Sequence, residues 1–412
     1  MMSIFIQMAA YRDPQLLLTI RDCISNADNP DQLVFGICWQ RNKNDSLEEF
    51  ASDSRFKIID VNYKDSKGAC WARNQIQQLY SDETYTLQLD SHHRFVKGWD
   101  TLLINMLTDL QSKGIKKPLI TGYIPSFDPE DDPVKRVNVP WQMNFDRFTP
   151  EGVVFFLPAS IKNWKELTAP VPARFYSAHF CFTLGQFATE VQHDPDYYFH
   201  GEEISITVRA YTHGYDLFHP HVVIAWHEYT RKGRTKHWDD HKDYTIANKA
   251  CHKRNRVLFG METSENPTEF GKYGFGTERT VSDYERYAGI SFAKRAIQQH
   301  TKDNLPPPNP DVDTVEQWEK SLLTCFKHCI NVHNSKLKLD DYDVVVVALK
   351  NSTGVEIYRQ DIKGAKLKQL KQQTGTFYNI WVEFITESTP VECIVWPHSV
   401  SQGWGERMIF NF

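Results

Sequence analysis

Asp90 and His92 are the residues of this chain whose types and spacing most directly suggest chemistry. A carboxylate oxygen and an imidazole nitrogen two positions apart could share one divalent cation. Both residues follow a segment, 84–89, in which polar and apolar residues alternate with the period of a strand. If the chain stays extended as far as His92, the two side chains point the same way. The alternative is a polar turn after the strand, with Asp90 capping a helix.

A later predicted strand also ends in a residue type that binds metals. Residues 222–226 are mostly apolar and are followed directly by His227. His237 and His241 lie four residues apart, and on a helix they could form a metal-binding pair. A metal-dependent hydrolase built on His227, His237 and His241 is therefore one alternative for the function.

The elements that must position these residues follow a strand–helix–strand order. Segments 3–8, 33–39 and 56–61 are predicted strands. Asp13 can cap a helix with Pro14 at its first position, and apolar residues at helical spacing follow. This order predicts an α/β fold with a doubly wound, mostly parallel sheet, in which ligands bind at the carboxyl edge.

Two predicted helix starts carry charged candidates. Arg73 lies near the beginning of a helix that follows Gly68, a suitable place for a diphosphate. Glu202 and Glu203 follow Gly201 at the start of an amphipathic helix and could hold sugar hydroxyls. The alternatives are an ordinary surface arginine and two glutamates that compensate the helix dipole.

The remaining pattern divides the chain into two domains. Helices are predicted over 95–110, 204–211, 279–298 and 315–330, and strands over 119–123, 153–157, 176–184, 342–349, 355–361, 376–385 and 392–396. The irregular stretch 125–140 is either an acceptor loop or a solvated loop. We predict a first domain over 1–302, a Pro-rich linker over 303–314, and a small domain over 315–412 that consists of a helix and a mostly β part.

Composition excludes several classes of protein. The 412 residues carry a formal net charge of -5, which disfavours a generic nucleic-acid-binding protein. No apolar run approaches the roughly 18 residues that span a bilayer, and the amino terminus lacks the pattern of a signal peptide. Eight cysteines without CxxC pairs fit reduced thiols. We therefore expect a cytoplasmic protein without a membrane span; its oligomeric state does not follow from the sequence.

Several short motifs, in order, resemble those of the cytoplasmic-type GlcNAc-transferases, whose best-studied members modify a hydroxyproline of a ubiquitin-ligase adaptor protein. The resemblance covers about the first 300 residues and does not extend beyond Pro310. The matching segments are Met8-Ala-Ala-Tyr-Arg-Asp-Pro14, Gly68-Ala-Cys-Trp-Ala-Arg-Asn74, Leu87-Gln-Leu-Asp-Ser-His-His-Arg-Phe95 with Trp99-Asp100, Phe199-His-Gly-Glu-Glu203, and Arg279-Thr-Val-Ser-Asp-Tyr284.

The resemblance implies a GT-A (Rossmann-like) glycosyltransferase domain, a UDP-sugar donor and a divalent ion, Mn²⁺ or Mg²⁺. The Asp-Ser-His triplet also resembles that of mucin-type GalNAc-transferases. By that pattern the metal ligands are Asp90, His92 and, at the end of the later strand, His227. It further implies that Ala9, Tyr11 and Arg12 contact the uridine, that Arg73 contacts the nucleotide or diphosphate, and that Glu202 and Glu203 lie near the donor sugar and acceptor.

The sequence therefore predicts a metal-dependent, retaining glycosyltransferase that moves a sugar, GlcNAc being favoured, from a UDP-sugar to a hydroxyl of a hydroxyproline-like protein or a glycan. A cation and cationic side chains can neutralise the departing diphosphate without a protein nucleophile. Two alternatives stay open: an inactive transferase-like module that binds sugar or protein, and a capsule-type polysaccharide synthase that uses another UDP-hexose.

Overall fold

The computed structural model describes residues 2–264, 270–338, 341–386 and 388–412. The chain forms two compact units whose segments alternate along the sequence. The first comprises Met1–Phe145, Phe156–Ala288 and Asn304–Asp311, and the second comprises Asp146–Phe155, Gly289–Asp303 and Val312–Phe412. The domains predicted from the sequence, 1–302 and 315–412, concern which parts fold independently, and they remain a prediction. No helix among the described residues is both long and apolar enough to cross a membrane.

The first unit is built on an eight-stranded sheet with the order β3-β2-β1-β4-β10-β6-β11-β9. Strands β1 to β4 are parallel to one another, and β10 runs antiparallel between β4 and β6. The strands are β1 Ile4–Tyr11, β2 Leu33–Arg41, β3 Phe56–Asn62, β4 Tyr85–Asp90, β6 Lys117–Thr121, β9 Val171–Pro172, β10 Phe180–Leu184 and β11 Tyr215–His219. A separate pair consists of β5 His93–Phe95 and β12 Ala225–His227.

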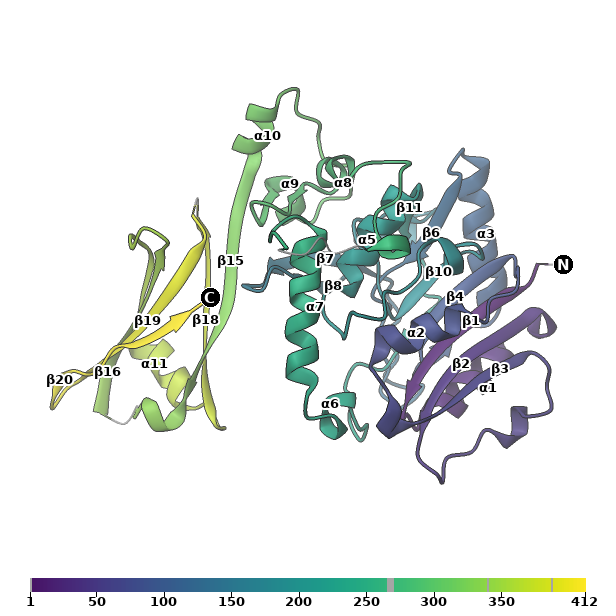
Figure 1. Ribbon diagram of the computed structural model, residues 1–412, viewed down its shortest axis with the longest axis horizontal. Coiled ribbons are helices and arrows are strands. Elements are labelled where there is room, and N and C mark those ends of the chain that lie inside the picture. Colours follow the sequence, from purple (N-terminus) through teal and green to yellow (C-terminus); the bar gives the residue numbers. More distant parts are fainter. Residues whose placement is uncertain (1, 265–269, 339–340, 387) are drawn as a thin grey trace. The chain divides into compact units, whose positions relative to one another are not determined.

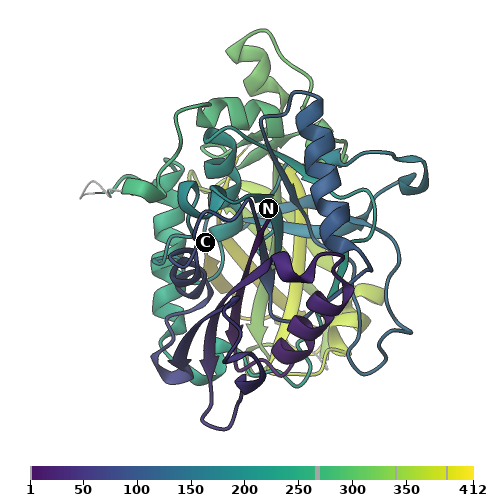
Figure 2. The same ribbon diagram turned by 90° about the vertical axis from the view of Figure 1, so that its right-hand side faces the viewer.

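Helices cover both faces of this sheet (Figures 1 and 2). The helices are α1 Leu16–Asn26, α2 Ala69–Gln77, α3 Trp99–Ser112, α4 Phe187–Glu190, α5 Glu202–Thr212, α6 His237–Asp240, α7 Tyr244–Leu258 and α8 Val281–Ala288. Apolar residues of α1 and α3 share one core with the inward side chains of β1, β2 and β4. Residues of α2 and α5 pack in separate clusters against other strand residues. This three-layer α/β arrangement confirms the predicted fold class.

The second unit is mostly β (yellow-green in Figure 1). Strands β15 and β18 form one antiparallel ladder, and β17, β16 and β19 form another with β20 and β21 at its edge. A core that contains Phe326, Val345 and Val395 lies between the ladders. The elements are β13 Ile290–Ser291, β14 Ala296–Gln298, α9 Gln299–Lys302, α10 Val315–Ser321, β15 Leu322–His333, β16 Tyr342–Asn351, β17 Glu356–Ile362, α11 Gly364–Lys371, β18 Phe377–Thr386, β19 Pro390–Ser399, β20 Gly403–Trp404 and β21 Met408–Asn411. Strand β7, Trp141–Phe148, begins in the first unit and strand β8, Val154–Ser160, ends in it, whereas the turn of this hairpin, residues 146–155, belongs to the second unit.

Two predicted helices were too long. The helix predicted over 279–298 ends at Ala288, because Gly289 adopts a positive φ of 63° and the chain continues as a strand. The helix predicted over 315–330 ends at Ser321, and β15 follows. In β15, Phe326, Ile330 and Val332 lie on one face at even spacing and are buried, which is the period of a strand.

His219 ends β11 as a buried, neutral histidine between two backbone groups. Its Nδ1 lies 2.8 Å from the Thr121 carbonyl oxygen, and its Nε2 accepts a hydrogen bond from the Met143 amide at 3.3 Å. Since Nδ1 must donate and Nε2 must accept, only the neutral tautomer satisfies both partners. Burial lowers the pKa of His219 from 6.5 to about 4.

The titration of His219 makes the protein less stable in acid. Between pH 6.5 and about 4 the unfolded chain binds a proton that the folded chain does not, so the free energy of unfolding falls as the pH falls. A His219→Gln variant lacks this titration, and its stability should depend less steeply on pH, by up to about 1.4 kcal/mol per pH unit. Urea unfolding of both proteins from pH 7 to pH 4.5 measures this difference, and parallel curves would contradict it.

Candidate active site

The ends of β1 and β4 form the floor of the site. The two strands are parallel, and Ala9 lies directly opposite Asp90 in the ladder. Tyr11, the last residue of β1, lies two positions further towards the carboxyl edge. This edge of an open α/β sheet is the position where ligands bind, because loops rather than strands continue beyond it.

The short ladder between β5 and β12 brings His227 to this edge. His227 pairs with His93, which follows Asp90 by three residues. The backbone of His227 is held on its other side as well, since its N–H donates to Pro125 and its carbonyl accepts from Phe127. The imidazole of a distant segment is thus held beside Asp90 by backbone hydrogen bonds.

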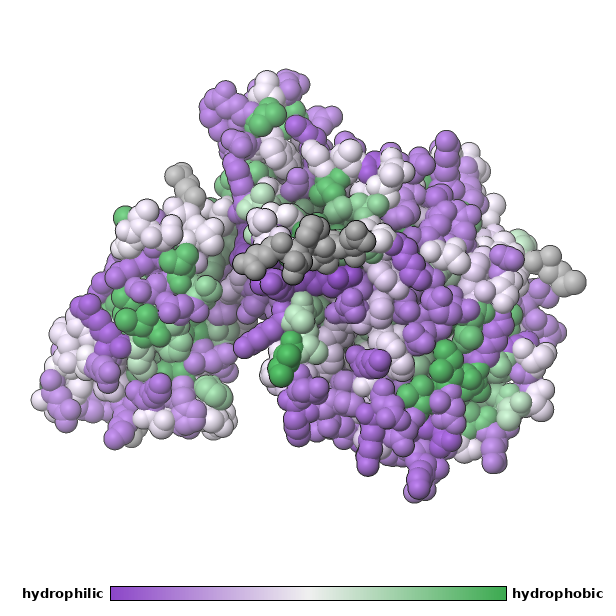
Figure 3. Space-filling view, in the orientation of Figure 1, coloured by the Kyte–Doolittle hydropathy of each residue, from purple (hydrophilic) through white to green (hydrophobic). Residues whose placement is uncertain are grey.

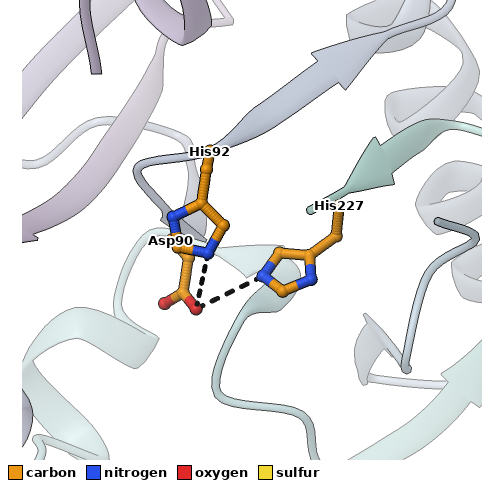
Figure 4. A group of neighbouring side chains, drawn as sticks. All are labelled: Asp90, His92 and His227. Carbon is orange, nitrogen blue, oxygen red and sulfur yellow. Dashed lines mark ion pairs between the residues drawn. The ribbon is translucent and has the colours of Figure 1, made fainter. Parts of the chain in front are cut away.

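Asp90, His92 and His227 form one compact cluster (Figure 4). The Oδ2 atom of Asp90 lies 3.7 Å from Nε2 of His92 and 3.5 Å from Nε2 of His227. One possible ligand atom from each residue lies within 4.8 Å of the others, an arrangement found for no other trio of His, Cys, Asp or Glu in the described part of the chain. The donor set of one carboxylate and two imidazoles fits a divalent transition ion.

Asp13 fixes the orientation of the His92 ring. Oδ2 of Asp13 lies 2.7 Å from Nδ1 of His92 and accepts a hydrogen bond from the Ser91 hydroxyl at the same distance. Burial opposes ionisation of Asp13, but hydrogen bonding from His92 and the Gln15 amide holds its pKa below the ordinary value. With the proton on Nδ1, the Nε2 lone pair of His92 faces Asp90, as a metal ligand requires.

The protonation states of the cluster suit a cation. Burial opposes the ionisation of Asp90, yet the neighbouring His227 and Arg73 hold the pKa of Asp90 well below its usual value. Burial lowers the pKa of His227 well below its ordinary value, so that its ring is neutral. Neither ring nitrogen of His227 has a hydrogen-bond partner among the described residues. A buried ring nitrogen without a hydrogen-bond partner is a candidate metal ligand.

Arg73 places a buried positive charge next to the cluster. It lies in the second turn of α2, and its NH2 donates to Oδ1 of Asp90 at 2.9 Å. Its Nε and NH1 atoms have no hydrogen-bond partner within the described chain, and NH1 lies 3.9 Å from Glu202. A guanidinium with free donors that lines a cleft can bind an anion such as a diphosphate.

The cluster lies in a cleft of about 340 Å³. Its walls combine aromatic rings with cationic side chains, which suits a ligand with planar and anionic parts. The lining residues are Ala9, Tyr11, Asp13, Gln40, Gly68, Ala69, Arg73, Asp90, Ser91, His92, Tyr198, Phe199, His227, Glu228, Tyr229, Arg231, Arg234, Thr235, Lys236, His237 and Trp238.

Most of the predicted site residues line this cleft. The three that do not are Arg12, Glu202 and Glu203. Arg12 lines a neighbouring groove and forms an ion pair with Asp240 at 2.7 Å. Glu203 accepts hydrogen bonds from the Tyr123 hydroxyl at 3.0 Å and the Ala178 amide at 2.9 Å. Burial raises the pKa of both Glu202 and Glu203, which favours their neutral forms. Their predicted catalytic role remains a prediction.

His237 and His241 do not converge on a common ligand position. Their rings stack 3.9 Å apart with an angle of 5° between them. Nε2 of His237 lies 3.4 Å from the Ser66 carbonyl and Nε2 of His241 lies 3.1 Å from the Tyr63 carbonyl. Both histidines therefore attach α6 to the backbone of 63–66, and this geometry does not support the alternative of a hydrolase site built on this pair.

Sequence reasoning missed much of the segment 228–238. Arg234 lies 2.7 Å from a carboxylate oxygen of Glu228 and 3.4 Å from Asp13, and its NH1 is 2.8 Å from Nε2 of His92. Trp238 and the cationic residues Arg231 and Lys236 also line the cleft. The high density of Lys and Arg directly after His227 is the sequence feature that could have indicated a cationic wall of the site.

The match to a protein family agrees with this geometry. The family described as Glycosyltransferase (GlcNAc) matches residues 3–54 and 46–294, which is more than half of the chain and includes every residue of the cluster. The chain belongs to this glycosyltransferase family. A comparison with curated proteins gives no significant match.

A solved structure of another glycosyltransferase shows the same fold. The crystal structure of GalNAc-T7 with UDP, GalNAc and Mn²⁺ aligns with a TM-score of 0.52 and 11% identity over 100% of this chain and 72% of that chain. TarS 1–349 from S. aureus in complex with UDP-GlcNAc aligns with a TM-score of 0.36 and 12% identity, over 60% of this glycosyltransferase and 64% of that chain. At 11% identity, the similarity to GalNAc-T7 shows a shared GT-A fold and nothing beyond the fold.

The three-residue cluster should determine metal affinity. Asp90→Asn or His227→Asn removes a ligand, so Mn²⁺ should bind each variant more than about 100-fold more weakly than it binds the unchanged glycosyltransferase. His241→Gln is the matched control, because it removes a nearby imidazole outside the cluster. Mn²⁺ titrations followed by electron paramagnetic resonance measure the affinities; equal loss in the His241 variant would contradict the assignment.

Asp13 should affect the metal without being a ligand. Asp13→Asn keeps the size of the side chain but removes the charge that holds the proton on Nδ1 of His92. Mn²⁺ affinity should fall roughly 10- to 100-fold, as for other residues that orient metal ligands. The same titration tests this, with circular dichroism to verify folding; unchanged affinity in a folded variant would show that His92 is oriented by other contacts.

Proposed function

We propose that the protein is a divalent-metal-dependent, retaining glycosyltransferase that moves GlcNAc from UDP-GlcNAc to an acceptor hydroxyl. The observation that carries this proposal is the convergence of Asp90, His92 and His227 beside Arg73 at the carboxyl edge of the sheet. Family membership supports sugar transfer and GlcNAc. The GalNAc-T7 structure, which contains UDP and Mn²⁺, supports the donor nucleotide and the metal.

The residues of the cleft can divide the work of donor binding. Mn²⁺ or Mg²⁺, when bound, would neutralise the negative charge that builds up on the departing diphosphate. Asp90, His92 and His227 would hold that ion, and Asp13 would keep His92 in the required orientation. Arg73 donates its free N–H groups to diphosphate oxygens, so that two positive charges oppose the same leaving group.

The walls of the cleft hold the rest of the donor. Ala9 and Tyr11, which line the cleft at the end of β1, would flank the uridine, and Arg12 would contribute from the neighbouring groove. Glu203 anchors the Tyr123 hydroxyl and the Ala178 amide, and so positions the wall on the side of the donor sugar. We assign Glu202 and Glu203 to the region between the donor sugar and the acceptor.

The acceptor hydroxyl can belong to a protein or to a glycan. The sequence motifs favour a hydroxyproline-like protein acceptor, and a glycan is the other class of acceptor that carries such hydroxyls. The oligomeric state plays no part in this proposal, since every residue of the cluster comes from one chain.

Donor binding provides the direct test of this function. A ligand that binds only the folded protein at 100 times its dissociation constant stabilises it by about 2.7 kcal/mol. UDP with Mn²⁺ should therefore raise the melting temperature clearly, UDP without metal much less, and ADP or GDP little. The Asp90→Asn variant should lose the Mn²⁺-dependent rise. An equal response to all three nucleotides would overturn the proposal.

Turnover and stereochemistry complete the test. In the absence of another acceptor, water takes the sugar, so UDP-GlcNAc incubated with protein and Mn²⁺ should be slowly hydrolysed to UDP and GlcNAc. NMR recorded before the free GlcNAc mutarotates should show retention of the α configuration. Glu203→Gln should lower turnover while leaving Mn²⁺ affinity unchanged, because Glu203 lies outside the ligand cluster. A β-configured product would contradict the retaining assignment and leave the metal assignment standing.

A further inference from the structure

One segment next to the cleft is strongly basic. Residues 231–256 contain nine Lys and Arg against three Asp, whereas the whole chain has 47 basic and 52 acidic residues. Five of the nine form ion pairs with Glu130, Asp13, Glu228, Asp194 or Glu262. The other four, Arg231, Lys236, Lys242 and Lys249, have no carboxylate partner among the described residues. Cations that no carboxylate neutralises are available to an external anion.

These four residues lead from the cleft onto the surface. Arg231 and Lys236 line the cleft, and Lys242 and Lys249 are exposed further along, just before and on α7. The opposite side of α7 is buried, since Cys251 packs with Tyr197 and Tyr198. In Figure 3 the surface over α6 is hydrophilic, and hydrophilic side chains flank a short hydrophobic strip along α7. We call Arg231, Lys236, Lys242 and Lys249 the basic track.

The basic track begins at an aromatic lip. The guanidinium of Arg231 lies 5.9 Å from the Phe199 ring centre and 5.6 Å from the Trp238 ring centre, and the two rings are 5.8 Å apart. Aromatic faces offer an apolar surface of fixed geometry at little conformational cost. Such faces suit the C–H faces of sugar rings, while the neighbouring cations suit acidic substituents on the same chain.

We propose that the acceptor is an anionic glycan, a sugar chain bearing carboxylate, phosphate or sulfate groups, which lies along the basic track with its accepting end at the aromatic lip. This inference rests on the proposed function. The donor diphosphate does not account for the track, because Lys242 and Lys249 lie outside the cleft and Arg73 already faces the diphosphate position. A neutral acceptor would leave these exposed cations without a role.

The observations favour a glycan over other polyanions. The cations alone would attract any polyanion, including a nucleic acid. The two rings of the aromatic lip, however, line the same cleft as the candidate metal ligands, and the family is one of glycosyltransferases. An acceptor that must present a hydroxyl group at this position is most simply a sugar chain.

Binding by the 412-residue chain tests the acceptor class. The probes are a decasaccharide of polygalacturonate, a neutral malto-decasaccharide, and a single-stranded ten-nucleotide DNA, each measured by fluorescence anisotropy at 20 and 200 mM salt. Polygalacturonate should bind at least about tenfold more tightly than the neutral glycan, and its binding should weaken with salt. A Lys242→Gln/Lys249→Gln variant should bind it at least about fivefold more weakly, with a smaller salt effect.

A matched variant and a second readout make the result decisive. Lys113→Gln/Lys116→Gln removes the same charge from exposed lysines in the turn after α3 and should bind polygalacturonate as the unchanged protein does. Equal affinity for the neutral glycan, tighter binding of the DNA, or equal weakening in both double variants would overturn the proposal. The Mn²⁺-dependent thermal shift with UDP is measured on the same samples. A normal shift with failed glycan binding overturns only the acceptor class, whereas an absent shift overturns the donor assignment.

Discussion

The ladder of three residue pairs between β5 and β12 is the contact on which the site depends. Its His93–His227 pair is the link between the end of β4 and a segment that follows β11. The bonds of His227 to Pro125 and Phe127 hold the same imidazole from the other side. Because backbone hydrogen bonds hold its position, the third candidate ligand is placed without depending on flexible side chains, as a preorganised metal site requires.

Charge in the cluster is distributed in the way a cation-binding site needs. Asp13 and Asp90 have lowered pKa values, while burial lowers the pKa of the neighbouring rings of His93, His179 and His227 and keeps them neutral. The negative charge therefore resides on carboxylates, and lone pairs remain on imidazoles. Arg73 is the counter-charge, and because it contacts Asp90 it links the candidate metal ligands to the candidate anion-binding guanidinium.

One continuous segment serves several parts of the proposed reaction. Within 227–249 the chain supplies a candidate metal ligand, the wall of the cleft, the aromatic residue Trp238 and all four cations of the basic track. Its histidines attach α6 to the backbone of 63–66, which precedes the helix of Arg73. Donor and acceptor sides are thus connected through neighbouring residues of one stretch, so a substitution there can alter both.

The sequence by itself determined the alternation of strands and helices and the presence of Asp90 and His227 at the ends of two strands, because these features follow from local periodicity. It placed the second of these strands over 222–226, whereas β12 covers Ala225–His227 and includes the histidine. It misplaced the ends of two helices. The helix that begins at Val281 is ended by Gly289, and the helix that begins at Val315 is ended by the pairing of β15 with β18, although the apolar residues that follow keep helical spacing. Only the tertiary structure decided that Asp13 orients His92, that Glu203 turns towards Tyr123, and that His227 reaches Asp90. These contacts join residues far apart in the chain, and hydrogen-bond partners across such distances depend on strand register and packing, which no local pattern contains.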